Sequence, residues 1–114
     1  MSQNHTVVKT FTVGDTRVAL ADTLVDINLE PIDLTDMDVV LRMVDDDGIV
    51  KVDDAVAIID ADPETGKISY SWADADVDTA GTYRYWWIVE DIGGRVEHYP
   101  ADGRKRKIIF VEPD

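Results

Sequence analysis

The residues whose spacing most resembles a metal-binding loop are three alternating aspartates, Asp74, Asp76 and Asp78. Alternating carboxylates open the calcium loop of an EF-hand, which also needs glycine at position six and a bidentate glutamate at position twelve. Those positions hold Thr79 and Tyr85, so the EF-hand pattern fails. A looser calcium or magnesium site that includes Asp60 and Asp62 is an alternative, but a solvated acidic loop explains the aspartates better. We predict no bound metal.

No residues of this sequence are spaced for catalysis. The two histidines, His5 and His98, lie far apart and follow no carboxylate pairing rule. No serine sits in a nucleophile setting, cysteine is absent, and no glycine-rich phosphate loop occurs. We therefore predict that the protein is not an enzyme and holds no cofactor.

Four of the eleven basic residues form one run, Arg104, Lys105, Arg106 and Lys107. The chain also has 24 acidic residues, 19 of them aspartate, and its net charge of −13 would repel a phosphate backbone or an anionic membrane. We predict no nucleic-acid and no membrane partner. The run is expected to meet an acidic surface of this chain or of a neighbouring copy, for example at residues 45–47 or 74–78. Alternatively, it blunts an edge strand against aggregation.

The same net charge bears on the environment of the protein. Self-repulsion would destabilise so acidic a fold in dilute buffer. Disorder is not the explanation, because 45% of the residues are apolar and the strand periodicity is clear. Concentrated salt screens repulsion within a few ångströms, and short aspartates keep a surface hydrated there. We predict a protein adapted to high salt, with an ordinary acidic mesophilic protein as the alternative.

The hydrophobic pattern predicts strands and turns without a helix. Nine segments have strand character: residues 6–13, 17–24, 38–44, 49–52, 55–59, 68–72, 83–90, 95–99 and 105–111. Turn sequences at 45–48, 62–66 and 91–94 separate several of them. We predict one domain over residues 1–114, with 1–5 and 112–114 as extended tails. The first five residues lack a signal-peptide pattern, and no apolar run approaches the roughly 20 residues that span a bilayer.

Residues 67–100 indicate which all-β fold this is. A tyrosine near the start of strand F closes a corner in many immunoglobulin-type domains by a hydroxyl-to-backbone bond. Tyr83 follows Ala80 and Gly81 in that context, and Tyr85 falls where an antibody domain has its second cysteine. We therefore predict an immunoglobulin-like antiparallel β-sandwich of about eight strands.

Alternation along residues 83–90 separates two faces. Core positions are predicted for Trp72, Tyr83, Tyr85 and Trp87, packed against Leu41, Met43, Ile58 and Ile68. The opposite face then exposes Trp86 beside Ile88, and exposed apolar pairs rimmed by charge mark protein contacts. The predicted interface residues are Trp86, Ile88, Arg84, Arg104, Lys105 and Arg106. The alternative is that the N-terminal segment or a loop covers the apolar pair.

Six stretches between residues 13 and 100 resemble, in order and spacing, the small immunoglobulin-like domain at the N-terminus of baseplate upper proteins of tailed phages. They are residues 13–16 (VGDT), 31–35 (PIDLT), 39–43 (VVLRM), 66–72 (GKISYSW), 79–83 (TAGTY) and 94–100 (GRVEHYP). The resemblance implies a structural protein of the virion, in the capsid, neck, tail or baseplate. The aspartate excess departs from typical members and points to a virus of a halophilic host.

Together these features predict a virion protein that acts through contacts with other virion proteins and with copies of itself. The alternative is a host-receptor or carbohydrate-binding module on the particle surface. Such a module would favour exposed aromatic residues near loop tips, with polar partners.

Overall fold

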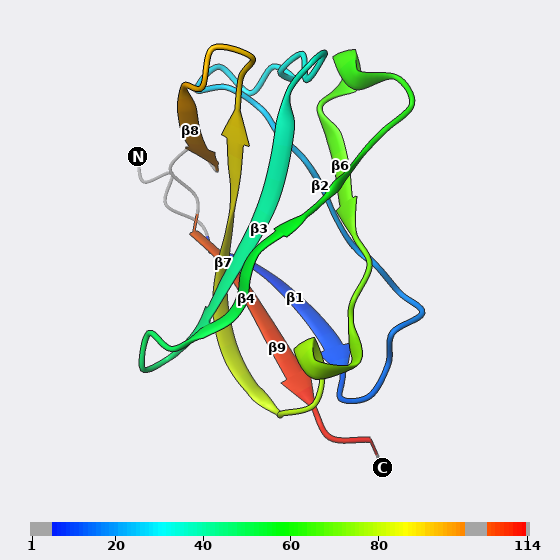
Figure 1. The fold of residues 1–114 in the computed structure, drawn as a ribbon. Coiled ribbons are helices and arrows are strands. Elements are labelled where there is room, and N and C mark those ends of the chain that lie inside the picture. Colours follow the sequence, from blue (N-terminus) through cyan, green and yellow to red (C-terminus); the bar gives the residue numbers. More distant parts are fainter. Residues whose placement is uncertain (1–5, 100–104, 114) are drawn as a thin grey trace.

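A computed structural model describes residues 6–99 and 105–113 and places their strands in two sheets packed face to face (Figure 1). The described strands are β1 (Thr6–Thr12), β2 (Leu20–Thr23), β3 (Asp38–Asp45), β4 (Val50–Val56), β5 (Ile58–Ile59), β6 (Lys67–Tyr70), β7 (Gly81–Glu90), β8 (Val96–Tyr99) and β9 (Lys105–Val111). Two short 3-10 turns, η1 (Pro63–Thr65) and η2 (Asp74–Asp76), lie between them. The predicted all-β sandwich is confirmed. The predicted tail 1–5, His5 and Arg104 lie outside the described residues.

The larger sheet, here sheet A, has the strand order β1-β9-β7-β3-β4, and β8 also pairs with β7. The smaller sheet B has the order β2-β6-β5. The long strand β7 is shared along its length, because Gly81 to Arg84 pair with β9 and Trp87 to Glu90 pair with β8. No helix in the described ranges is long and apolar enough to cross a membrane.

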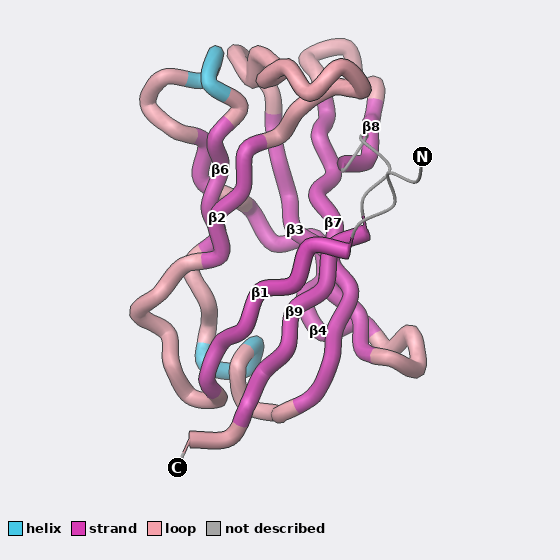
Figure 2. The backbone as a smooth tube through the Cα atoms, turned by 180° about the vertical axis from the view of Figure 1, so that it is seen from behind, coloured by secondary structure: helices cyan, strands magenta, loops and turns pink. Residues whose placement is uncertain are grey.

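One strand pair departs from the predicted antiparallel arrangement. β1 and β9 run parallel along one edge of sheet A, where Figure 2 shows them side by side. A tight hairpin forces antiparallel pairing, but β1 and β9 are far apart in the sequence and no hairpin joins them. Local periodicity therefore left their relative direction undetermined.

The core lies between the two sheets and follows strand alternation. Trp87 and Leu41 are fully buried, and Tyr83 and Tyr85 are nearly so, which confirms the register predicted for β7. The other predicted core residues, Trp72, Met43 and Ile68, are also buried.

Ile58 is the one predicted core residue that the structure places outside, with 58% of its surface exposed. The chain crosses from β4 of sheet A to β5 of sheet B at Ala57, which is buried. This crossing sets the register of the short strand, so Ile59 packs against the core and Ile58 points outward.

Gly66 fixes the entry into β6. It ends η1 in the left-handed region with φ +70°, and a Cβ there would lie 2.6 Å from the backbone oxygen of Leu24. Its own carbonyl accepts a hydrogen bond from the Leu24 N–H at 2.8 Å. Only glycine permits so close an approach of the two backbones.

Candidate functional site

The outer face of sheet A, turned away from sheet B, carries three of the predicted interface residues. Because β7 turns Tyr85 and Trp87 into the core, alternation points Arg84, Trp86 and Ile88 outward. Arg84 is exposed, whereas Trp86 and Ile88 are half-buried. The structure thus brings these three side chains to one face.

Neighbouring strands extend this face with further apolar and basic side chains. The cross-strand pairs are Arg42 with Trp86, Val40 with Ile88, and Lys107 with Arg84. Farther out, Val8 on β1 is 50% exposed and Val56 on β4 is 79% exposed. We call Arg42, Arg84, Trp86, Ile88 and Lys107 the contact face.

Arg42 is held in place at the border of this face. Its guanidinium donates to Asp54 at 2.9 Å and to Asp53 at 3.0 Å, both on the edge strand β4. The hydrogen bond with Asp54 is the largest influence that raises the pKa of Arg42. Asp54 adopts φ +55° where the β3–β4 ladder is irregular. The two carboxylates are therefore engaged by Arg42.

Carboxylates are scarce on this face although the chain has 24 acidic residues. Among the described outward positions of β1, β3, β7, β8 and β9, only Asp38 and Glu90 are acidic, and they stand opposite each other at one end. At the β4 edge, Asp53 and Asp54 add two carboxylates that bind Arg42. The middle of the face is apolar and cationic on a protein of net charge −13. Protein interfaces are enriched in tryptophan and arginine and depleted in aspartate and glutamate.

Strand alternation in β9 places the residues of the basic run on opposite sides of the sheet. The predicted exposure of Arg106 is therefore wrong. Arg106 alternates with Lys107 and shares the core side with Ile108, and only 9% of its surface is exposed. Arg106 therefore belongs to the interior, while Lys107 points outward. Arg104 lies outside the described residues, and of Lys105 the structure describes only the strand position.

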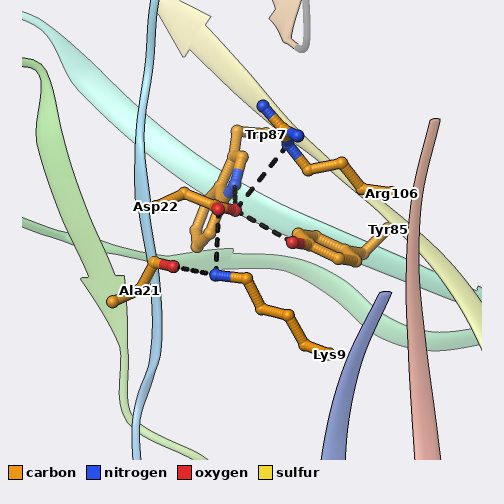
Figure 3. Close-up of polar contacts among 6 residues, drawn as sticks. All are labelled: Lys9, Ala21, Asp22, Tyr85, Trp87 and Arg106. Atoms are coloured by element: carbon orange, nitrogen blue, oxygen red, sulfur yellow. Dashed lines mark hydrogen bonds and ion pairs between the residues drawn. The ribbon is translucent and has the colours of Figure 1, made fainter. Parts of the chain in front are cut away.

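Arg106 points into a charge centre between the sheets, built around Asp22 of β2 (Figure 3). One carboxylate oxygen of Asp22, Oδ2, accepts hydrogen bonds from Trp87 Nε1 at 2.8 Å and from the Tyr85 hydroxyl at 3.0 Å. The Arg106 Nε lies 3.9 Å from the same oxygen. The other oxygen, Oδ1, pairs with Lys9 Nζ at 3.0 Å. The Asp22 side chain is only 9% exposed.

This centre ties three strands of sheet A to sheet B. Lys9 reaches it from β1 and also donates to the backbone carbonyl of Ala21 on β2. Burial, followed by the Asp22 charge, raises the pKa of Tyr85 well above its ordinary value, so this phenol stays a donor. This centre was not predicted from the sequence. The signal was present, because Asp22 alternates with the buried Leu20 and Leu24.

The tyrosine corner is confirmed, and it explains the place of the centre in the fold. The Tyr83 hydroxyl donates to the backbone carbonyl of Thr79 at 2.8 Å. Tyr85, two residues on, occupies the position of the second cysteine in an antibody domain. Its partner Asp22 lies on the strand that would carry the first cysteine. A hydrogen-bonded charge centre thus joins the sheets where antibody domains have a disulfide.

The three alternating aspartates do not converge on a common point. Asp76 is buried, and its Oδ2 accepts from the Tyr70 hydroxyl at 2.6 Å and from the Ala73 N–H at 2.8 Å. Asp78 pairs with Lys51 at 2.5 Å, and this hydrogen bond lowers the pKa of Asp78. The described residues contain no group of three or more histidines, cysteines, aspartates or glutamates that could hold a metal ion.

Three loops share one turn geometry that begins with an aspartate: residues 26–30, 45–49 and 91–95. In each, the first side chain accepts hydrogen bonds from the backbone N–H groups of the third and fifth residues, at 2.8–3.0 Å. The first N–H donates to the fifth carbonyl, and the fourth N–H donates back to the first carbonyl. The fourth residues have positive φ: Leu29, Gly48 and Gly94. We call these the aspartate turns.

The aspartate turns present apolar side chains to solvent. Ile27 is 78% exposed, Leu29 55%, Ile49 64% and Ile92 90%. In the third turn the backbone hydrogen bond from Arg95 is the main cause that lowers the pKa of Asp91. The carboxylates that begin these turns thus shape the backbone, and the neighbouring positions remain available for contacts.

Comparison with known proteins adds the following findings. Residues 2–95 match a family model described as the BppU N-terminal domain. No curated protein matches the chain. Among solved structures, CopC from Methylosinus trichosporium OB3b has a similar fold, with a TM-score of 0.55 and 10% sequence identity, over 95% of this chain and 87% of that chain. At this identity the likeness concerns the fold alone.

Proposed function

The chain belongs to the BppU N-terminal domain family, the domain of a phage baseplate upper protein, and on that basis we propose that it is a non-enzymatic structural subunit that binds other virion proteins through its contact face. The family places the protein in the virion. The contact face is the observation that supports this mode of action. It is apolar and cationic on an otherwise strongly acidic chain.

A face of this composition is expected to bind another protein surface. Half-buried Trp86 and Ile88 leave apolar surface in water, and its removal from water on contact is favourable. Tryptophan and arginine are the residue types that most often dominate binding energy at protein interfaces. The flanking cations, Arg84 and Lys107, would select an acidic partner surface and fix its orientation.

Particle incorporation tests the proposal. Trp86→Ala and Arg84→Glu should each reduce the amount of this protein in purified particles several-fold, measured by quantitative mass spectrometry. Two outward residues of sheet B provide matched controls: Ile58→Ala removes an exposed apolar side chain, and Lys67→Glu reverses an exposed charge. Circular dichroism of each free protein checks the fold. Normal incorporation of both contact-face variants would refute the proposed surface.

The receptor-binding alternative has less support from the positions of the aromatic residues. All three tryptophans, four tyrosines and two phenylalanines of the chain lie in the core or on sheet A. The exposed side chains of the aspartate turns are aliphatic, such as Ile27 and Ile92. A hollow of about 430 Å³ beside β8 is lined by Met37, Val89, Asp91, Arg95, Val96 and Glu97. Glycan-array binding that Ile92→Ala abolishes would favour the alternative.

We further propose that the host is halophilic, because the net charge is −13. Screening of self-repulsion should raise the melting temperature substantially between dilute buffer and molar potassium chloride. A competing explanation is that aspartates are abundant for local structural reasons, as in the aspartate turns. A melting temperature that does not change over this salt range would refute the halophilic interpretation and leave the structural one.

A further inference from the structure

The contact face requires a partner surface that is acidic and carries an apolar side chain. The tip of the β3–β4 hairpin, residues 45–49, has this chemistry and projects from the body of the sandwich (Figure 1). Asp46 and Asp47 are exposed at the tip, and Ile49 beside them is 64% exposed. Val50, the first residue of β4, adds further exposed apolar surface at 39%.

The other acidic segments of the described chain fit the contact face less well. Asp76 and Asp78 are engaged by Tyr70 and Lys51 within the same molecule. The aspartate turn at 91–95 ends in the exposed cation Arg95, and the turn at 26–30 offers the single carboxylate of Glu30 beyond its structural aspartate. Among the aspartate turns, the tip at 45–49 alone combines two exposed carboxylates with an exposed isoleucine.

The tip is held ready for contact by its own backbone. Asp45 accepts hydrogen bonds from the N–H groups of Asp47 and Ile49, both at 2.9 Å, and Gly48 supplies the positive φ that the turn needs. The Asp45 carboxylate is therefore occupied in the turn, whereas Asp46 and Asp47 are exposed to solvent. A preformed turn loses little conformational entropy when it binds.

The tip borders its own contact face, because Val44 directly before it pairs with Arg84, but it cannot fold back over Trp86 and Ile88 of its own molecule. It connects β3 and β4, which are neighbours in sheet A, and the five residues of the turn are too few to fold back over that sheet. A tip can therefore cover Trp86 and Ile88 only on another copy. When two copies do not reciprocate such a contact, it is heterologous and builds rings or open chains.

We propose that copies of this protein associate head to tail, with the tip at residues 45–49 of one copy on the contact face of the next. The carboxylates of Asp46 and Asp47 meet Arg84 and Lys107, and Ile49 packs against Trp86 and Ile88. This inference rests on the proposed function, because it names a second copy as one occupant of the contact face.

Complementary variants test the arrangement by light scattering of the purified protein in concentrated salt. The face variant R84E/K107E and the tip variant D46K/D47K should each be monomeric, whereas the unmodified chain forms higher oligomers. An equimolar mixture should regain oligomers, because the unmodified tip of the face variant binds the unmodified face of the tip variant, and the reversed tip of the tip variant binds the reversed face of the face variant. The chain with all four substitutions should regain oligomers. The control K67E/R95E has the same net charge as the face variant and should behave as the unmodified chain.

Three results would overturn the proposal. The first is a tip variant that still forms oligomers, which would indicate a face-to-face contact. The second is a mixture that stays monomeric although both variants have the circular dichroism of the unmodified chain. The third is an unmodified chain that is monomeric at millimolar concentration. The third result would leave the proposed function untouched, because that function is tested separately by the incorporation of Trp86→Ala into particles.

Discussion

Removal of the Asp22 carboxylate should be among the most destabilising single changes in this protein. Asp22→Ala leaves Arg106, whose side chain is 8% exposed, without this buried counter-charge, and removes the acceptor of Tyr85 and Trp87. Loss of one partner from a buried ion pair lowers the free energy of unfolding by about 3–5 kcal/mol. Lys9 adds little to this loss, because its side chain is 27% exposed and water can solvate it.

This magnitude is large against the whole stability of a small domain, which is about 5–15 kcal/mol. The melting temperature should fall by roughly 15 °C. Urea unfolding at neutral pH, followed by tryptophan fluorescence, measures the change in free energy directly. Asp15→Ala is a control at an exposed aspartate of the β1–β2 loop and should change the free energy by less than about 0.5 kcal/mol.

Two further variants separate charge from hydrogen bonding. Asp22→Asn keeps an acceptor for Trp87 or Tyr85 but removes the negative charge, so it should recover only part of the loss. The double variant Asp22→Leu with Arg106→Met replaces the ion pair by apolar groups and should be more stable than Asp22→Ala. If Asp22→Ala unfolded within about 1 kcal/mol of the unmodified chain, the centre would not hold the sheets together as argued.

Three other perturbations have definite expected outcomes. Trp87→Ala should lower the free energy of unfolding by about 3–5 kcal/mol, because the indole is fully buried and bonded to Asp22, and denaturant unfolding would show it. Burial raises the pKa of all four tyrosines, so their contribution to stability is complete below the unfolded pKa of about 10 and is lost as pH rises above it. Tyrosinate absorbance should therefore appear together with alkaline unfolding. Titration of one phenol at a lower pH than unfolding would contradict this. The pKa of Asp91 is lowered, so its contribution to stability is present above the unfolded pKa of about 4 and is lost as pH falls through the folded pKa. The difference in stability between the unmodified chain and Asp91→Asn should therefore shrink in acid. A difference independent of pH would contradict the role of the Asp91 carboxylate in closing the turn.

Local periodicity was sufficient wherever a strand is half-buried along its whole length. In β7 the alternation of aromatic and other side chains fixed which residues enter the core, and Trp87 and Trp86 lie on the predicted sides. The Tyr83 corner was predictable because its hydrogen bond spans only four residues. Pairing between distant strands was not, since the parallel β1–β9 ladder depends on packing that no local pattern encodes.

The buried pair of Asp22 and Arg106 shows why the charge centre was not predicted. Arg106 was grouped with its basic neighbours, and Asp22 was not assigned to the core, because charged residues are rarely buried. Alternation within their own strands places Arg106 with Ile108 and Asp22 with Leu20, all on the core side. Each charge is tolerated inside only because the other is there, and a single strand does not reveal such a pair. The core position predicted for Ile58 was wrong for a similar reason, since the crossing at Ala57 depends on both sheets.

In the aspartate turns, the residues that maintain the backbone differ from the residues whose side chains are exposed. Each turn is closed by its first side chain and by the positive φ of its fourth residue, and its second and third side chains take no part in that closure. Mutation at Asp46 and Asp47, or at Ile92, therefore changes the surface without altering the backbone that displays it. Under the proposed head-to-tail contact, a lineage of viruses can in this way exchange the specificity of its assembly contacts while selection on folding acts elsewhere in the chain.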